Sequence, residues 1–340
     1  MTTTSGGRWR AAIEMLGIFI LVSSVLTTAP QADVSIEYLQ TKDIHENIYG
    51  SAVISETVFL LVGSRGMIYR SEDKGETWRV IPSGTRKTLY SVSFSDPETG
   101  WVSGQSGLIL HTKDGGKTWV RQESGTKKHL FGVSFADVRH GCAVGDWSII
   151  IYTDDGGLNW KDASLKEDVL LYDVNMEDAL NGCAVGEFGG IFLTGDGGLS
   201  WQRVESPDTE GHSLFCMNRD GDSVYAGGMD GLIIFSKDRG KTWRISENPL
   251  HKSIYGISVS GRAGWAVGDS GTALSTDDGG ESWQPQDVPE SYRLFWLKTL
   301  QLQKWDNDDK NGFAAGANGL FMNISSRSLS WHGRNKNDDK

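Results

Sequence analysis

Short stretches in which apolar and polar residues alternate recur along most of the chain. One of them is Leu89–Phe94, and Gly100–Gly104, 107–111 and 118–122 follow it with glycine-rich or acidic turns between them. Alternation over four to eight residues, bounded by turn residues, is typical of half-buried strands. The chain has no helical periodicity of useful length. The pattern therefore predicts an all-β protein built from groups of four short strands.

A repeat of about 41 residues runs through this pattern. Seven tryptophans are spaced by 41, 41, 41, 42, 40 and 48 residues, and a glycine stands 15 residues before each of them. Three residues after that glycine, six repeats have a second glycine and the third repeat has Ser148. The tryptophans are Trp78, Trp119, Trp160, Trp201, Trp243, Trp283 and Trp331, and an aromatic residue leads each repeat: Tyr49, Tyr90, Phe131, Tyr172, Phe215, Tyr255 and Phe295. The chain thus contains seven copies of one structural unit.

A four-stranded unit of this length is typical of one blade of a β-propeller. A single blade cannot bury both of its faces, so we expect residues 33–334 to form one seven-bladed β-propeller. The last repeat is imperfect, while 34–40 precedes the first repeat where an outer strand would lie. We therefore predict that this N-terminal strand joins the outer edge of the seventh blade, because pairing the chain ends in one sheet removes a free seam.

A second motif, Ser/Thr-x-Asp-x-Gly-x-(Thr/Ser/Asn)-Trp, lies between the third and fourth predicted strands of six repeats. Its carboxylates can accept hydrogen bonds from turn amides, and its glycines can adopt a positive φ. A metal or catalytic role for these acids is the alternative, but six copies of one active site around a ring would be implausible. We interpret the motif as a structural turn. The copies are 71–78, 112–119, 153–160, 194–201, 236–243 and 276–283.

The motif is the Asp-box of sialidases and related propellers, but the complete pattern is closer to another family. Leu-Tyr-x-Val-x-Phe, Gly-Trp-x-x-Gly-x-x-Gly-x-Ile and Asp-Gly-Gly-x-Thr-Trp follow one another at Leu89–Phe94, 100–109 and 114–119. In this succession the chain resembles the photosystem II assembly/stability factor family. The resemblance implies a seven-bladed, non-enzymatic chaperone in the thylakoid lumen or bacterial periplasm. Such a factor binds a nascent membrane subunit during assembly of the photosystem reaction centre.

The N-terminal segment is typical of a secretory signal peptide. Arg8 and Arg10 precede an uncharged run at 15–26, and small residues lead to Ala29 and Ala32. This apolar run is shorter than the roughly 20 residues that a membrane-spanning helix needs. We therefore expect 1–32 to be a cleaved signal peptide, with an uncleaved tether as the alternative, and the mature protein to be exported. We expect 335–340 to be a flexible tail.

Charge and cysteine content exclude further classes. The net charge of −11 argues against a nucleic-acid partner, because phosphate contacts need a basic face. Three cysteines cannot form a disulfide framework. Cys142 and Cys183 occupy equivalent positions in adjacent repeats, where we expect small buried side chains, and a bond between them remains an alternative. We expect no metal site, no cofactor and no small-molecule substrate.

The candidate partner-binding residues lie on loops that we expect to share one face of the propeller. In the first three repeats they form a basic sector on an acidic protein, suited to an acidic or phosphate-bearing partner. Two aromatic residues occupy equivalent turns of neighbouring repeats, and exposed aromatic residues are frequent anchors of interfaces. Packing at the rim and a solvated loop surface are the alternative interpretations. These residues are Arg65, Arg86, Lys87, Lys127, Lys128, His129, Trp147 and Phe188.

Three functions are compatible with these features. The first is a protein-binding assembly factor for a membrane protein complex, which would bind a membrane-protein subunit or its extracytoplasmic segment. The second is a periplasmic accessory of an exporter or other envelope complex in a non-photosynthetic bacterium. The third is a sialidase-like glycoside hydrolase, which would need an arginine triad, a nucleophile and an acid near the axis. Because the inner strands Leu89–Phe94, 131–135 and 254–259 are apolar or small, we expect no catalytic residues.

Overall fold

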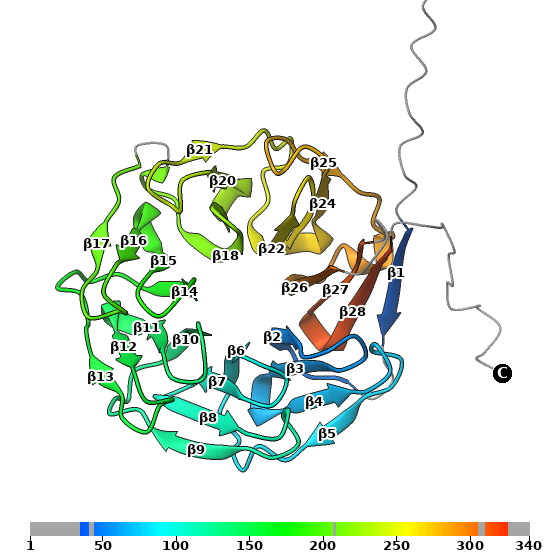
Figure 1. Cartoon of the computed structure of the whole chain (residues 1–340). Coiled ribbons are helices and arrows are strands. Elements are labelled where there is room, and N and C mark those ends of the chain that lie inside the picture. The colour runs from blue at the N-terminus through cyan, green and yellow to red at the C-terminus, as the bar shows by residue number, and fades with distance from the viewer. Residues whose placement is uncertain (1–34, 41–43, 207–208, 305–309, 326–340) are drawn as a thin grey trace, which may run out of the picture. The chain divides into compact units, whose positions relative to one another are not determined.

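A computed structural model describes residues 35–40, 44–206, 209–304 and 310–325. Within these ranges the strands form seven antiparallel four-stranded sheets, and Figure 1 shows the sheets arranged around a central axis. They belong to one compact unit, Asp33–Lys340. The predicted seven-bladed β-propeller is therefore confirmed. The predicted signal peptide (1–32), the tail (335–340) and Trp331 lie outside the described residues.

We number the blades 1 to 7 along the chain and give their strands from the axis outward. Blade 1 comprises β2 (Ile48–Val53), β3 (Phe59–Gly63), β4 (Ile68–Ser71) and β5 (Arg79–Ile81). Blade 2 comprises β6 (Leu89–Phe94), β7 (Gly100–Gly104), β8 (Leu108–Thr112) and β9 (Val120–Glu123). Blade 3 comprises β10 (Leu130–Phe135), β11 (Gly141–Gly145), β12 (Ile150–Thr153) and β13 (Lys161–Asp162). Blade 4 comprises β14 (Leu171–Met176), β15 (Gly182–Gly186), β16 (Ile191–Thr194) and β17 (Gln202–Arg203). Blade 5 comprises β18 (Leu214–Asp220), β19 (Ser223–Gly228), β20 (Ile233–Ser236) and β21 (Arg244–Ile245). Blade 6 comprises β22 (Ile254–Ser260), β23 (Ala263–Gly268), β24 (Ala273–Thr276) and β25 (Gln284–Pro285). Short 3-10 turns are η1 (Ser64–Gly66), η2 (Asp146–Ser148), η3 (Glu187–Gly189), η5 (Met229–Gly231), η6 (Asp269–Gly271), η7 (Glu290–Tyr292) and η8 (Ala317–Gly319).

Blade 7 joins the two ends of the chain. It contains β26 (Leu297–Lys304), β27 (Lys310–Gly316), β28 (Leu320–Ser325) and, as its outer strand, β1 (Ser35–Gln40). The pairing of β1 with β28 is antiparallel, with Ser35 opposite Ser325 and Gln40 opposite Leu320, and Figure 1 shows the blue β1 beside the orange-red β28. The predicted closure by an N-terminal strand is confirmed.

The hydrophobic core lies between the blades. The described residues contain seven core clusters, each drawing side chains from two adjacent blades. Between blades 1 and 2, for example, Leu60 and Val62 pack against Val102 and Leu110. Because each sheet buries both faces against its neighbours, the second strand of every blade is apolar along most of its length.

The inner strands approach one another closely around the axis. A Cβ on Gly50 would lie 3.1 Å from the Cα of Ser91, and one on Gly132 would lie 3.2 Å from the Cα of Asp173. Neighbouring inner strands do not pair, so their backbone amides need other acceptors. Polar side chains of the preceding blade accept these hydrogen bonds: Ser91 from Val133, Ser93 from Phe135, Ser134 from Met176, Asp173 from Met217 and Asn218 from Val259.

The Asp-box turns have the hydrogen bonds of a structural turn. In blade 2, the Asp114 carboxylate accepts hydrogen bonds from the Thr112 hydroxyl (2.8 Å), the Thr118 amide (2.9 Å) and the Thr118 hydroxyl (2.6 Å). Burial opposes ionisation of Asp114, but these hydrogen bonds lower its pKa to about 2. An acid with so low a pKa stays ionised at neutral pH and suits a turn better than proton transfer.

Two details of the sequence interpretation change. In blade 7, Leu297 pairs with Gly316 as Ile48 pairs with Gly63, and the bulged residue that follows is Lys298 in blade 7 and Tyr49 in blade 1. The residue equivalent to the leading aromatic of the other blades is therefore Lys298, and the assignment of Phe295 was wrong because β26 and β27 form a longer hairpin.

Cys142 and Cys183 are buried and free, so the alternative of a disulfide is excluded.

Candidate functional site on the loop face and the axial channel

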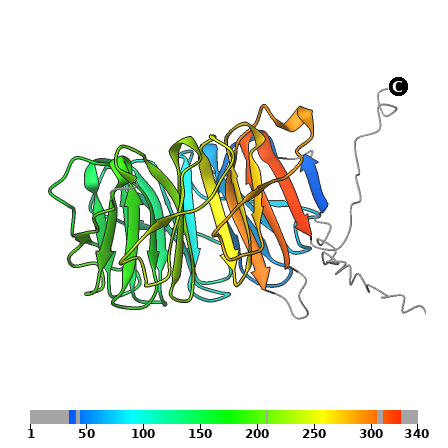
Figure 2. The ribbon, with the colours of Figure 1, turned by 90° about the horizontal axis from the view of Figure 1, so that it is seen from above.

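The strands run between two faces of the ring, as Figure 2 shows from the side. On one face, the turn between the second and third strands of a blade contacts the loop that enters the same blade. The Ser64 amide donates to the carbonyl of Asn47 (2.9 Å), and the Asp146 amide donates to that of His129 (3.0 Å). The Asp-box turns lie at the other ends of the same strands. We call the first face the loop face, and it contains all eight residues proposed from the sequence.

The tip of each loop-face turn holds a residue in the left-handed region, as a two-residue type I′ turn requires. Their φ values lie between 51° and 58°. Trp147 and Phe188 are the bulky aromatic members of this set, and their side chains are 62% and 60% exposed. The equivalent residues are Arg65, Ser106, Trp147, Phe188, Asp230, Ser270 and Asn318. A large aromatic residue with positive φ is strained, and exposure gives it no compensating burial, so packing within the protein does not explain why aromatic residues stand at these two tips.

Neighbouring side chains hold these two turns in place. The Lys128 ammonium donates to the carbonyl of Trp147 (3.0 Å), and the Arg203 guanidinium donates to the carbonyl of Phe188 (3.3 Å). Ser148 is fully buried, and its hydroxyl accepts from the Val169 amide at 3.0 Å. The aromatic rings are therefore presented on a fixed backbone, which limits the entropy lost when a partner binds.

The structure divides the six basic residues into two groups. Lys87 donates to the carbonyl of Ser106 (3.3 Å) and Lys128 to that of Trp147, while His129 lies beside Asp146 (3.4 Å), so these three residues support the turns. Arg65, Arg86 and Lys127 are exposed and, among the described residues, form no ion pair. Arg65 and Arg86 border one groove of about 440 Å³.

A channel of about 300 Å³ follows the axis and is lined by the inner strands. At the loop face, six neighbouring aromatic rings line its mouth, and a seventh, Trp296, stacks on Tyr49; neighbouring ring centroids lie 5.2 to 6.0 Å apart. We call these rings the aromatic girdle: Tyr49, Tyr90, Phe131, Tyr172, Phe215, Tyr255 and Trp296. The channel is polar and asymmetric, with Lys298 at the level of the girdle and Asp173 and Arg219 among its other lining residues. These three charged residues come from blades 4, 5 and 7, whereas the inner strands that the sequence analysis described as apolar or small belong to blades 2, 3 and 6.

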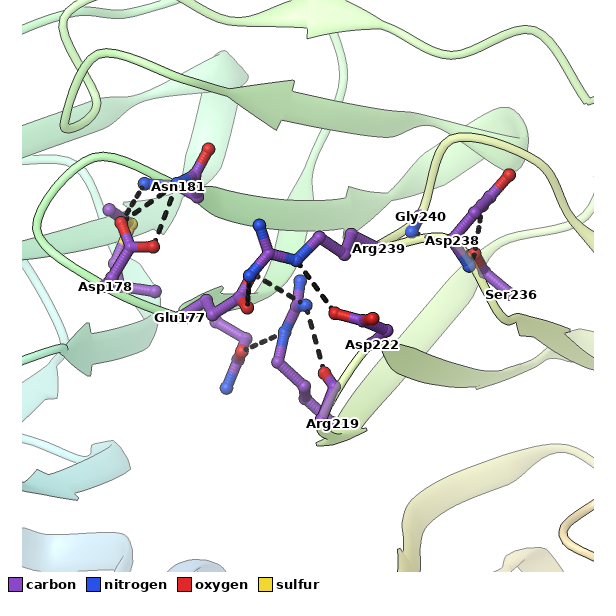
Figure 3. A network of polar contacts seen from close by, with 12 residues as sticks. Glu177, Asp178, Asn181, Arg219, Asp222, Ser236, Asp238, Arg239 and Gly240 are labelled. Atoms are coloured by element: carbon purple, nitrogen blue, oxygen red, sulfur yellow. Dashed lines mark hydrogen bonds and ion pairs between the residues drawn. The ribbon is translucent and has the colours of Figure 1, made fainter.

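At the opposite end of the channel, two arginines converge on one carboxylate, as Figure 3 shows. Glu177 of blade 4 pairs with Arg219 (2.9 Å) and Arg239 (2.5 Å) of blade 5, and Arg239 also contacts Asp222 at 3.0 Å. We call these four residues the Glu177 network. Arg219 lines both the channel and a second cavity of about 300 Å³ beside the network. The sequence offered no signal for this site, because its members do not recur in the other repeats.

Among the described residues that line the channel, Asp173 has the one carboxyl side chain. Most glycoside hydrolases use two carboxyl groups, about 5 to 10 Å apart, although sialidases use a tyrosine nucleophile. Asp173 lies on β14, whereas Glu177 follows the end of that strand and does not line the channel. Both oxygens of Asp173 accept backbone hydrogen bonds, and Glu177 is paired with arginines. Among the described residues, no group of three or more His, Cys, Asp or Glu side chains could hold a metal ion.

A family model described as photosynthesis system II assembly factor YCF48 matches residues 31–128 and 158–256, which is more than half of the chain. The chain belongs to the YCF48 family. Comparison with curated proteins gives no match. Membership supports an assembly-factor role and agrees with the resemblance seen in the repeats.

Solved structures share the fold of this YCF48-family protein. A structure described as YCF48 bound to D1 peptide is 21% identical, has a TM-score of 0.67, and the match covers 85% of this chain and 96% of that one. YCF48 from Cyanidioschyzon merolae is 19% identical with a TM-score of 0.69, and the match covers 85% and 98% of the two chains. A GH74 xyloglucanase from Xanthomonas campestris is 11% identical with a TM-score of 0.68, over 84% of this chain and 53% of that one. Propellers of this architecture thus include enzymes as well as assembly factors.

Asp173 should make the stability of this YCF48-family protein depend on pH. Burial raises the pKa of its carboxyl group to about 6, although the Lys298 charge and backbone hydrogen bonds oppose the shift. Since the folded state binds this proton more tightly than the unfolded state, the contribution of Asp173 to stability is lost as the pH rises through about 6.

Replacing Asp173 by asparagine removes this titration. We expect the unfolding free energy of Asp173→Asn, relative to that of the parent, to increase by about 1–2 kcal/mol between pH 4.5 and pH 8, a value reduced from the full shift because the side chain borders the channel. Urea unfolding at both pH values measures the difference. A constant difference would contradict the raised pKa, and Asp168→Asn serves as an exposed control.

Proposed function

We propose that this protein is a non-enzymatic assembly factor that binds an extracytoplasmic segment of a membrane-protein subunit on its loop face. Family membership supports the assembly role, and the two exposed aromatic residues with left-handed backbone carry the assignment of the face. A photosystem II subunit is the client that the family suggests. One similar structure is described as bound to D1 peptide, so a peptide of that subunit is the first probe. Export past the cytoplasmic membrane is part of the proposal.

Trp147 and Phe188 are the anchors of this interface in our proposal, and Arg65, Arg86 and Lys127 supply charge beside them. Aromatic anchors at the centre of an interface contribute most of its binding energy, whereas rim charges mainly affect the rate of association and its dependence on salt. We therefore assign the affinity to the aromatic pair. Arg65, Arg86 and Lys127 favour an acidic segment of the membrane-protein subunit.

The double variant Trp147→Ala/Phe188→Ala should bind a fluorescently labelled D1 peptide at least 30-fold more weakly than the parent, which is about 2 kcal/mol. Fluorescence anisotropy measures the affinity. Leu158 and Leu199 are 79% and 57% exposed on the opposite face of the same two blades, so Leu158→Ala/Leu199→Ala is the matched control. Equal affinities of the two double variants would remove the loop face from the proposal.

The same assay tests the charged part of the face. Charge reversal at Arg65, Arg86 and Lys127 should reduce binding of the peptide most strongly at low salt, because salt screens exposed charges.

Incubation with xyloglucan and with sialosides should give no hydrolysis above a protein-free blank. Turnover that survives further purification would contradict the non-enzymatic assignment.

A further inference from the structure

Lys298 occupies a position at the channel mouth that is aromatic in every other blade. Its six equivalents, each at the bulge near the start of an inner strand, are Tyr49, Tyr90, Phe131, Tyr172, Phe215 and Tyr255. The Lys298 side chain is half-buried and lines the axial channel. Blade 7 thus places one cation inside the aromatic girdle.

The Lys298 ammonium has weak protein partners. It donates one long hydrogen bond to the carbonyl of Phe215 (3.4 Å) and lies 5.7 Å from the centroid of the Tyr255 ring. Within the described residues no carboxylate lies at ion-pair distance from it. An ammonium group can donate three hydrogen bonds, and the negative charge of Asp173 acts on Lys298 only from beyond ion-pair distance, so the burial of this cation is incompletely compensated. The site therefore favours an anion.

The channel wall below Lys298 presents donors. Ser91, Ser93 and Ser134 use their oxygens to accept amide hydrogen bonds from the next blade, and this leaves their hydroxyl hydrogens to donate. Among the described residues, these three hydroxyls have no acceptor at hydrogen-bonding distance. Asn218 likewise accepts through Oδ1 and retains its NH₂ group. All four residues line the channel.

The carboxylate in the upper channel does not offset this excess of donors. Asp173 Oδ1 accepts from the Val174 amide and Oδ2 from the Met217 amide, both at 2.9 Å. Its lone pairs are therefore partly committed to the backbone. The ligand that satisfies the remaining groups carries acceptors and negative charge, and it is small enough for a channel of about 300 Å³.

We propose that the axial channel binds a small oxyanion, a carboxylate or a phosphate, through Lys298 and the donor groups beneath the aromatic girdle. This site is separate from the turns that hold Trp147 and Phe188 and does not depend on the peptide interface. Citrate and inorganic phosphate are suitable probes because one carries only carboxylates and the other is a phosphate, so together they distinguish the two chemistries.

Calorimetric titration of the full-length protein with each probe, at ionic strength held constant with sodium chloride, tests the site. We expect at least one probe to bind with a dissociation constant below about 1 mM. In Lys298→Tyr, which restores the residue found in blades 1, 2, 4 and 6, binding should weaken at least tenfold. Lys166→Tyr, at an exposed lysine in the loop that enters blade 4 on the same face, should leave binding unchanged.

The proposal fails if neither probe binds, or if Lys298→Tyr binds as well as the parent. If Lys298→Tyr does not fold, the amide resonances of the unaltered protein still test the site. On addition of the tighter probe, the amide resonances of Cys216 and Thr299, beside the channel mouth, should shift, whereas those of Leu158 and Leu199 on the opposite face should not. Shifts confined to exposed loops would also overturn the proposal.

Discussion

Replacement of Glu177 by glutamine is expected to lower the free energy of unfolding by about 3 kcal/mol, because it removes one partner from a poorly hydrated ion pair. The side chains of Arg219 and Glu177 are only 9% and 16% exposed, and their contact joins blades 4 and 5. Glutamine keeps the size of the side chain but leaves the Arg219 charge with only neutral partners, the side-chain oxygen of Asn175 and the carbonyl of Gly221. Equilibrium urea unfolding measures the loss.

A second pair between blades provides the control for this prediction. Lys237 and Glu281 join blades 5 and 6, but their side chains are 59% and 54% exposed. Exposed pairs contribute little, so Lys237→Met should change the free energy of unfolding by less than about 1 kcal/mol. Similar losses in Glu177→Gln and Lys237→Met would show that burial does not set the strength of the Glu177 network.

Replacement of Trp101 by alanine is expected to lower the free energy of unfolding by about 3–5 kcal/mol, since it leaves a large cavity between blades 2 and 3. The indole is fully buried and stacks on Phe135 with a centroid distance of 3.4 Å. It also stacks on His111 at 5.0 Å and donates a hydrogen bond from Nε1 to the carbonyl of Gly156 (3.2 Å). The variant loses the buried apolar area, the ring contacts and this hydrogen bond together.

An exposed tryptophan separates this effect from the loss of an indole in general. Trp147→Ala removes the same side chain from a turn where it is 62% exposed, so its free energy of unfolding should stay within about 0.5 kcal/mol of the parent. Thermal or urea unfolding compares the two variants directly. A loss below 1 kcal/mol in Trp101→Ala would mean that the blades repack around the cavity.

Local sequence patterns predicted most of the architecture. Each blade repeats the same turn residues and the same alternation, so the strand order follows from positions close together in the chain. The left-handed tips show the physical basis, since Gly66 (φ 75°) and Gly107 (φ 69°) follow the tip residue in turns that require positive φ. The same repeats placed Trp147 and Phe188 at equivalent tips of adjacent blades. Their exposure and their fixed backbone came from the structure.

The axial channel shows where sequence interpretation ends. Asp173, Arg219 and Lys298 come from blades 4, 5 and 7, and no local pattern indicates that they line the same space. The longer hairpin of blade 7 also concealed the position of Lys298, because a search for a leading aromatic residue selects Phe295. Lys87, Lys128 and His129 support turns, whereas Arg65, Arg86 and Lys127 are exposed, and nothing in the sequence distinguishes the two groups.

The sequence by itself determined the class of fold and the number of blades, because these depend on short-range turn geometry and on a repeat that recurs at nearly constant spacing. It also determined the closure of the ring, because the last repeat is imperfect and an additional strand precedes the first repeat. Only the tertiary structure decided which polar groups meet at the axis and which charges are paired. Those properties arise where inner strands from distant parts of the chain converge without pairing, so their side chains must satisfy the backbone of a neighbouring blade and one another.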